Sequence, residues 1–298
     1  MLLFLLCRTL YSRSLFLKLR SVSPFLNDPT KTRYRIIFCD IDGTLIDSGL
    51  RVSAGTKQKI QQLNSIGIPF ILVSARMPSG VFPIQNTLGI KAPIICYSGA
   101  LILDEHGGCI KSVGIEDEKA AEVDATIKKE WKSICCSVFS HDDWIVSDVR
   151  NPWVVREHHI TLSEPTEGSL SDLIAAKRHI HKFLCMGDAG QITDIDNELN
   201  RKFPDLTVYR SKDTYLEIMN GAASKSGAVG YLCEDYGIPT ELAVSFGDNY
   251  NDVDMLRATG VGFAMGNAPE GVKRQTQYVT LDNDNEGVLA GLNQLDFA

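Results

Sequence analysis

This 298-residue sequence lacks several features that mark specialised protein classes. Its eight cysteines form no Cys-x-x-Cys pair, so neither a zinc site nor a disulfide framework is indicated, and a reducing compartment fits best. No apolar run approaches the roughly 18–20 residues that cross a bilayer, so we expect no transmembrane helix and no stable membrane association. The formal net charge of −7 argues against nucleic-acid binding, which needs clustered Lys and Arg. No internal repeat or low-complexity segment is present, and ordinary composition indicates a globular chain.

Residues 1–30 differ in composition from the rest of the chain. They begin with MLLFLLCRTLYSRSLFLKLR and carry four basic residues but only one acid, Asp28. A transit peptide, a secretory signal and an unstructured or mis-started extension all remain open. We exclude this extension from the fold and expect a cytoplasmic protein, with organellar targeting as the alternative.

From Tyr34 onward, short apolar runs alternate with amphipathic stretches, which is typical of βα units and a parallel sheet. The predicted strands are 35–39, 69–73, 93–96, 243–246 and 261–264. Helices are expected to begin near Ser53, Ala223, Asn251 and Asp284. Both ends of the chain therefore contribute to one α/β core, residues 31–112 and 212–298, which we expect to be Rossmann-like.

The middle of the chain has a different pattern. A hairpin around Gly107-Gly108 is followed by a charged helix from Glu116 to about Lys132. Two strand-like runs, ICCSVFS and WIVSD, flank Asp142-Asp143, and the strand HKFLCMG, the helix TDIDNELNRKF and the strand LTVYR follow. This order predicts a second α/β unit, residues 113–211, inserted into the first.

The stretch IIFCDIDGTLID, residues 36–47, ends an apolar run with two carboxylates, Asp40 and Asp42. Residues two apart in an extended chain point the same way, so we expect both side chains to leave the strand on one side. Two like charges so close need a cation or a proton between them, and magnesium suits carboxylate oxygen. Gly43 permits a tight turn, and the Thr44 hydroxyl could tie it back. A solvated turn is the alternative.

A second acidic cluster follows another apolar strand, in SFGDNYNDVDML at residues 245–256. Asp248 comes directly after the strand, and Asn251 and Asp252 open the next helix. Because the carboxyl ends of strands in an open α/β sheet converge on one crevice, Asp248 could meet Asp40 and Asp42. Three carboxyls, several waters and a substrate phosphate make a reasonable magnesium shell.

Two more residues could complete a phosphate site. Ser74 ends the apolar run FILV, and its hydroxyl and the N–H groups after it could donate to phosphate oxygens. Lys225 opens a helix, where the helix dipole also favours anions. Considered singly, Ser74 could be a helix cap and Lys225 a solvated lysine.

This order of features resembles the haloacid dehalogenase superfamily of phosphotransferases. Its four motifs correspond to DIDGT at 40–44, VSAR with Ser74, SKSGAV with Lys225, and GDNYND at 247–252. The insertion between the second and third motifs resembles the α/β cap of the Cof-type, class IIB branch, as do YLEI before the lysine motif and GFAMGNAPEGVK after the fourth. The resemblance covers residues 34–295.

The resemblance implies a magnesium-dependent phosphatase that acts on a small phosphorylated metabolite, with a sugar phosphate as the leading candidate. Asp40 would attack phosphorus to form an aspartyl-phosphate, and Asp42 would act as general acid and then as general base. Mg²⁺ would be held by Asp40, the backbone carbonyl of Asp42, and Asp248, with Asp252 orienting the ligands. The phosphate oxygens would be held by Ser74, Lys225 and Asn251 and by the backbone at Ile41 and Ala75.

One departure from the family pattern bears on substrate range. Many Cof-type members carry Asn-Gly-Ala after the third strand, whereas this chain has Ser98-Gly99-Ala100. A phosphosugar mutase is the alternative enzyme, and a non-catalytic sensor of a phosphorylated metabolite is the alternative outside enzymes. A monomer or a homodimer is expected.

Overall fold

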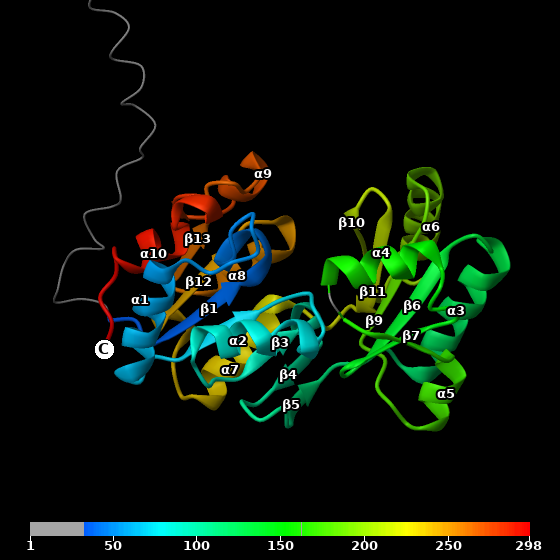
Figure 1. Cartoon of the computed structure of the whole chain (residues 1–298), viewed down its shortest axis with the longest axis horizontal. Coiled ribbons are helices and arrows are strands. Elements are labelled where there is room, and N and C mark those ends of the chain that lie inside the picture. Colours follow the sequence, from blue (N-terminus) through cyan, green and yellow to red (C-terminus); the bar gives the residue numbers. More distant parts are fainter. Residues whose placement is uncertain (1–32, 162) are drawn as a thin grey trace, which may run out of the picture.

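The computed structural model describes residues 33–161 and 163–298, so the expectations for residues 1–30 lie outside the described residues. Two sheets organise the chain, and Figure 1 shows them as two lobes, with both ends of the described chain in one lobe and the middle in the other. This is an α/β fold with an inserted α/β cap, as the sequence predicts. None of the helices in the described residues combines the length and the apolar character needed to cross a membrane.

The core lobe is built on an eight-stranded sheet in the order β14-β13-β12-β1-β2-β3-β4-β5. The strands from β14 to β3 are parallel, and β4 and β5 are antiparallel additions. The five core strands predicted from the sequence are confirmed. The strands are β1 (Ile36–Asp40), β2 (Phe70–Val73), β3 (Ile94–Cys96), β4 (Leu101–Leu103), β5 (Cys109–Ser112), β12 (Ala243–Gly247), β13 (Val261–Ala264) and β14 (Tyr278–Val279).

Helices cover both faces of this sheet, because its strands are apolar on both sides. In β1, Ile37 and Cys39 join the apolar cluster under α1, α2 and α10, whereas Ile36 and Phe38 join the cluster under α7 and α8. The helices are α1 (Ala54–Ser65), α2 (Phe82–Leu88), α7 (Lys225–Asp235), α8 (Val253–Ala258), α9 (Glu270–Lys273) and α10 (Gly287–Leu292).

Two of these helices begin near the positions predicted from the sequence, and each has a serine cap. The Ser53 hydroxyl accepts a hydrogen bond from the N–H of Thr56 at 3.1 Å, at the start of α1. The Ser224 hydroxyl accepts from the N–H of Gly227 at 3.0 Å, so α7 begins at Lys225. The second cap fixes the position of the lysine singled out in the sequence.

The cap lobe is built on a six-stranded sheet in the order β10-β11-β9-β6-β7-β8, in which only β7 and β8 pair in parallel. The predicted charged helix and the predicted strands of this region are confirmed. The strands are β6 (Cys135–Ser140), β7 (Asp143–Val146), β8 (Pro165–Glu167), β9 (Lys182–Met186), β10 (Leu206–Lys212) and β11 (Tyr215–Asn220), and the helices are α3 (Asp117–Glu130), α4 (Pro152–Thr161), α5 (Leu170–Ala175) and α6 (Ala189–Lys202).

The two faces of the cap sheet have different surroundings. Phe183 and Cys185 of β9 and Leu216 and Ile218 of β11 pack into the apolar cluster under α3, α5 and α6. The alternate residues of the same strands point to the other face. That second face looks toward the core lobe.

The predicted boundary between residues 211 and 212 divides a hairpin. Strands β10 and β11 pair antiparallel, with Tyr209 opposite Glu217, and β11 continues into β9. The segment YLEI, which the sequence analysis left with the core, therefore lies in the cap sheet. Its short apolar run suits either sheet, and only the pairing with β10 and β9 decides between them.

Candidate active site

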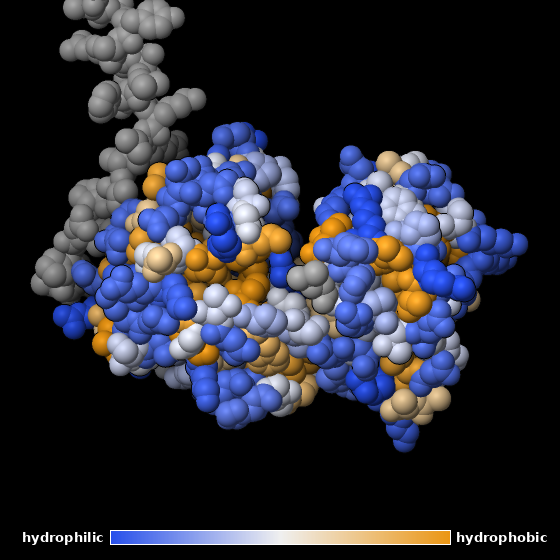
Figure 2. Space-filling model, in the orientation of Figure 1, coloured by the Kyte–Doolittle hydropathy of each residue, from blue (hydrophilic) through white to orange (hydrophobic). Residues whose placement is uncertain are grey.

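The predicted site residues gather where the carboxyl ends of β1, β2 and β12 face the cap. A cavity of about 480 Å³ opens there between the two lobes, and Figure 2 shows the surface hollowed between them. The parallel pairing of β1 with both β2 and β12 brings three strand ends to one edge of the sheet. The core residues lining the cavity include Asp40, Asp42, Ser74, Ala75, Asp248, Asn251 and Asp252.

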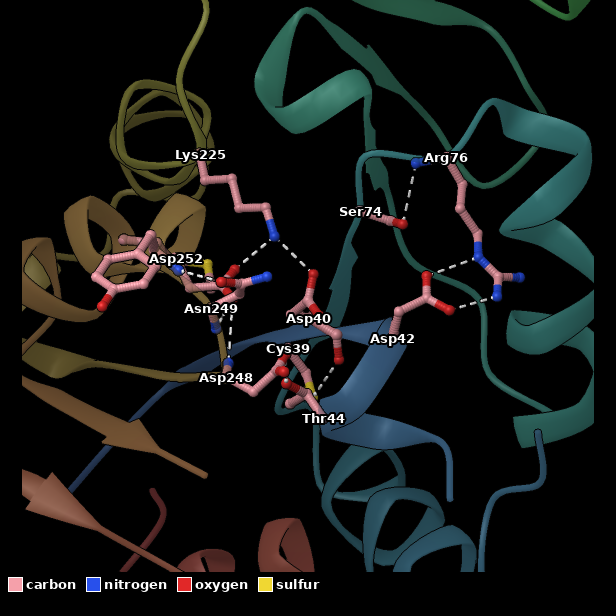
Figure 3. A network of polar contacts seen from close by, with 12 residues as sticks. Cys39, Asp40, Asp42, Thr44, Ser74, Arg76, Lys225, Asp248, Asn249 and Asp252 are labelled. Atoms are coloured by element: carbon pink, nitrogen blue, oxygen red, sulfur yellow. Dashed lines mark hydrogen bonds and ion pairs between the residues drawn. The ribbon is translucent and has the colours of Figure 1, made fainter. Parts of the chain in front are cut away.

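Lys225 forms ion pairs with two acids of the site, Asp40 at the end of β1 and Asp252 in the segment after β12. Its ammonium lies 2.6 Å from Asp40 Oδ1 and 2.5 Å from Asp252 Oδ1, and its side chain is 1% exposed (Figure 3). The second oxygen of Asp252, Oδ2, accepts from the backbone N–H groups of Asp248 and Asn249 at 3.1 and 2.9 Å. Asp252 thus ties the loop after β12 to the start of α7.

Asp248 is fixed from the opposite side by the turn after β1. Thr44 donates its hydroxyl hydrogen to Asp248 Oδ1 at 3.1 Å, and Asn267 Nδ2 lies 2.8 Å from the Gly43 carbonyl and 3.4 Å from Asp248 Oδ2. Gly43 has a φ of +76°, and a Cβ there would come within 2.5 Å of Asp248 Oδ2. Only glycine therefore lets the carboxylate of Asp248 sit against this turn.

The cluster holds more negative than positive charge. Burial raises the pKa of Asp40 well above its usual range, with Lys225 opposing the rise and Asp252 adding to it. Burial and the neighbouring Asp252 raise the pKa of Asp248 to about 6. Burial alone would lower the pKa of Lys225, but Asp252 and Asp40 outweigh it and raise that pKa. One ammonium thus serves three carboxylates, so the site favours an additional cation or proton.

These acids fit a divalent cation. One oxygen from each of Asp40, Asp248 and Asp252 lies within 4.8 Å of the others. Both oxygens of Asp252 already accept hydrogen bonds, whereas within the described residues Asp40 accepts through Oδ1 alone. Asp40 and Asp248 are therefore better placed than Asp252 to hold a hard cation, and Asp252 has the contacts of an orienting residue.

Asp42 lines the same cavity as Asp40, as the sequence predicts, although β1 ends at Asp40 and the chain then turns. The carboxylate of Asp42 forms a two-pronged ion pair with Arg76, with Nε to Oδ2 at 2.8 Å and Nη2 to Oδ1 at 2.6 Å (Figure 3). Asp42 still lines the cavity, and its side chain is 54% exposed.

The predicted phosphate-binding residues differ in how far their side chains are buried. Ser74 is buried at the end of β2, and its hydroxyl accepts from the N–H of Arg76 at 3.1 Å. Ala75 and the exposed Asn251 line the cavity, whereas the side chain of Ile41 is buried in the core. The turns after β1, β2 and β12 therefore surround one space, and Lys225 contacts it through Asp40 and Asp252.

Sequence reasoning missed several contributors. Arg76 and Asn267 stand inside motifs quoted from the sequence, but nothing there indicates that they pair with Asp42 and Asp248. The cap side of the cavity was not predicted, because its residues share no motif and meet only through strand pairing. Cap residues lining the cavity include Phe139, Trp144, Glu157, Lys182, Tyr209, Lys212, Tyr215 and Glu217.

Comparisons with protein families and with single proteins all match this chain to the same family. A family model described as haloacid dehalogenase-like hydrolase matches residues 37–292. A Haemophilus influenzae protein, provisionally named a phosphatase, is 36% identical over 257 residues, 86% of this chain and 95% of its own length. Pyridoxal phosphate phosphatase YbhA of Escherichia coli is 25% identical over 265 residues, 85% of this chain and 96% of its own.

A solved structure shares the arrangement of core and cap. The subclass IIB sugar phosphatase BT4131 superposes with a TM-score of 0.74, at 22% identity, over 87% of this chain and 98% of its own. At this identity the likeness concerns the fold. With the family model spanning most of the chain, the chain belongs to the haloacid dehalogenase-like hydrolases, in their Cof-type branch, and is a phosphoric monoester hydrolase.

Proposed function

We propose that this chain hydrolyses small phosphomonoesters, sugar phosphates foremost, with magnesium and through an aspartyl-phosphate on Asp40. The observation that carries the proposal is the buried cluster of Asp40, Lys225 and Asp252, which opens with Asp248 onto the cavity between core and cap. A non-catalytic sensor would have no need of a buried, lysine-paired carboxylate at the cavity floor. Sugar phosphates are the first esters to test, because a sugar phosphatase shares this fold.

In the first step, an oxygen of Asp40 forms a bond to phosphorus while the bond from phosphorus to the leaving alcohol oxygen breaks. Asp42 gives that oxygen a proton. In this structure both oxygens of Asp42 are engaged by Arg76, so Asp42 has to leave that ion pair before its carboxyl group can reach the leaving oxygen. Lys225 remains beside Asp40 and holds it in position for attack.

In the second step, a water attacks phosphorus and the acyl phosphate bond breaks, which restores the Asp40 carboxylate. Asp42, now deprotonated, takes the proton of that water. Ser74, Lys225 and Asn251, with the backbone N–H groups at Ile41 and Ala75, hold the phosphate oxygens through both steps. The released phosphate leaves through the cavity.

A bound Mg²⁺ would lower the repulsion between a carboxylate and a phosphate dianion. Asp40, Asp248 and the backbone carbonyl of Asp42 are the groups that would hold it. The raised pKa values of Asp40 and Asp248 fit this role, because a divalent cation would balance the surplus negative charge.

Phosphate release from a panel of sugar, nucleotide and cofactor phosphates tests the proposal. We expect release with Mg²⁺ and loss of release with EDTA. Release that survives chelation would refute the magnesium requirement. Conversion of a sugar phosphate to an isomer without phosphate release would favour a mutase. No phosphate release from any ester of the panel would refute phosphatase activity on small esters.

A further inference from the structure

Two opposite charges are buried on the cap face that looks toward the core. Lys182, the first residue of β9, and Glu217, in the middle of β11, lie 3.2 Å apart, and each side chain is 9% exposed. The neighbouring residues on this face are apolar: Phe139, Trp144 and Leu184 are all buried. All five line the cavity.

Burying such a pair is unfavourable unless the charges serve some purpose. Taking an ammonium and a carboxylate out of water costs several kcal/mol for each ion, and an apolar pair of similar volume is often as stable or more so. A sheet face with Phe139, Trp144 and Leu184 could pack apolar residues at these positions. Stability alone therefore does not account for Lys182 and Glu217.

The pair also reaches the predicted phosphate site. Lys182 Nζ lies 3.3 Å from the carbonyl oxygen of Ala75, the residue after Ser74. Tyr209, on β10, donates its hydroxyl hydrogen to Glu217 Oε2 at 3.2 Å. Strand pairing sets Tyr209 opposite Glu217, so the register of the cap sheet aligns these groups. The charges therefore stand next to the place where a leaving group would emerge from the phosphate.

Both members keep hydrogen-bonding capacity for a ligand. Glu217 engages the described residues through Oε2 alone, which leaves Oε1 as an acceptor. The ammonium of Lys182 has three hydrogens and two oxygen partners, Glu217 and the Ala75 carbonyl. An acceptor and a donor thus stand side by side. The ring of Phe139 is centred 4.9 Å from Lys182 Nζ and stacks on Trp144. The half-buried ring of Tyr209, which also lines the cavity, offers an apolar face.

We propose that Lys182 and Glu217 bind neighbouring hydroxyl groups of the leaving alcohol and thereby select polyhydroxylated phosphate esters. One hydroxyl donates to Glu217 Oε1, and its neighbour accepts from Lys182, while C–H groups of the same molecule pack against the aromatic rings. This inference rests on the proposed function and adds the residues that set its substrate class.

The test compares esters that differ only in their hydroxyl groups. Glucose 6-phosphate is paired with tetrahydropyran-2-ylmethyl phosphate, and glycerol 3-phosphate with propyl phosphate. For Glu217→Gln and Lys182→Met we expect kcat/KM for the hydroxylated esters to fall about tenfold to a hundredfold, as for loss of a charge-assisted hydrogen bond. For the two esters without hydroxyls, we expect a change of less than about threefold.

Two further variants guard against misfolding and against a general charge effect. The double variant Lys182→Met with Glu217→Gln leaves no charge unpaired, and it should unfold at a temperature close to the wild type while losing the same selectivity. Lys128→Met removes an exposed lysine on α3 of the cap that pairs with Asp124 outside the cavity, and it should leave the ratio of kcat/KM values unchanged.

Equal losses on both members of each pair would overturn the inference and make the ion pair a structural link between cap and core. A wild type that favours the esters without hydroxyls, or a flat aromatic ester such as pyridoxal 5′-phosphate, would overturn it as well. A wild type that releases phosphate from none of these esters would instead refute the proposed function on which the inference depends.

Discussion

At the scale of single residues, one lysine partly balances the charge of three neighbouring carboxylates in the site. Lys225 is surrounded by Asp40 and Asp252, and Asp248 lies within reach of both acids. Each carboxylate is buried or half-buried, so its charge is not screened by water. Removing the lysine would therefore leave like charges facing each other.

Lys225→Met should lower both stability and turnover. We expect the free energy of unfolding, measured with urea and EDTA at pH 8, to fall by about 3 kcal/mol, since a buried carboxylate loses its partner. Turnover should fall about a hundredfold or more, because phosphate loses its cation. Lys273→Met, which removes a surface lysine near Glu270, is the control. An unchanged free energy of unfolding in Lys225→Met would show that Lys225 does not stabilise the buried carboxylates.

The sequence predicted which acids meet, but not how each is held. Asp40, Asp248 and Lys225 follow from strand ends and a helix start, which parallel pairing brings to one edge. The ion pair of Asp42 with Arg76 did not follow, because no local pattern links the turn after β1 to the turn after β2. Lys182 and Glu217 come together only through the pairing of β9 with β11. No local pattern predicts such a register.

At the scale of elements, the start of α7 depends on the loop that follows β3. Gly99 in that loop has a φ of +104°, and a Cβ there would lie 2.1 Å from the carbonyl oxygen of Ser224. Ser224 is the cap of α7, and the helix begins with Lys225. Two segments more than 120 residues apart in sequence are thus in direct backbone contact, and this contact positions the lysine.

Gly99→Ala should therefore disturb the site from outside it. The added methyl group cannot fit against backbone, so α7 has to shift; we expect a lower unfolding temperature and a fall in kcat of about tenfold or more. Gly230→Ala is the matched control inside α7, where nothing lies within 4 Å, and it should stabilise the protein by up to about 1 kcal/mol. Unchanged kcat in Gly99→Ala would contradict the positioning role of this contact.

At the scale of the whole molecule, core and cap also meet on a buried histidine. His181, just before β9, stacks on Tyr97 of the core, with ring centroids 5.4 Å apart. Its Nδ1 accepts from the N–H of His141 at 3.0 Å, so Nε2 carries the hydrogen and donates to Ser112 at 2.9 Å. Burial, with His141, His179 and Arg178 nearby, lowers the pKa of His181 to about 3.

This histidine predicts a loss of stability in acid. In the unfolded chain His181 takes up a proton near pH 6.5, whereas in the folded protein it stays neutral down to about pH 3. Its contribution is therefore present above pH 6.5 and is lost as the pH falls toward 3. Between pH 6 and pH 5 the wild type should lose about 1 kcal/mol more unfolding free energy than His181→Asn.

The control is His106→Asn, which removes an exposed histidine beside Glu105. If the free energy of unfolding falls equally for the wild type and His181→Asn between pH 6 and pH 5, then folding does not keep His181 neutral.

The central claim is that Asp40 is the nucleophile, and Asp40→Asn tests it most directly. The amide keeps the shape and removes one surplus negative charge, so the fold should be at least as stable as the wild type. Phosphate release with Mg²⁺ should be measured for both proteins on an ester that the wild type hydrolyses. We expect no release above background from a folded Asp40→Asn. Release near the wild-type rate from that variant would show that Asp40 is not the nucleophile.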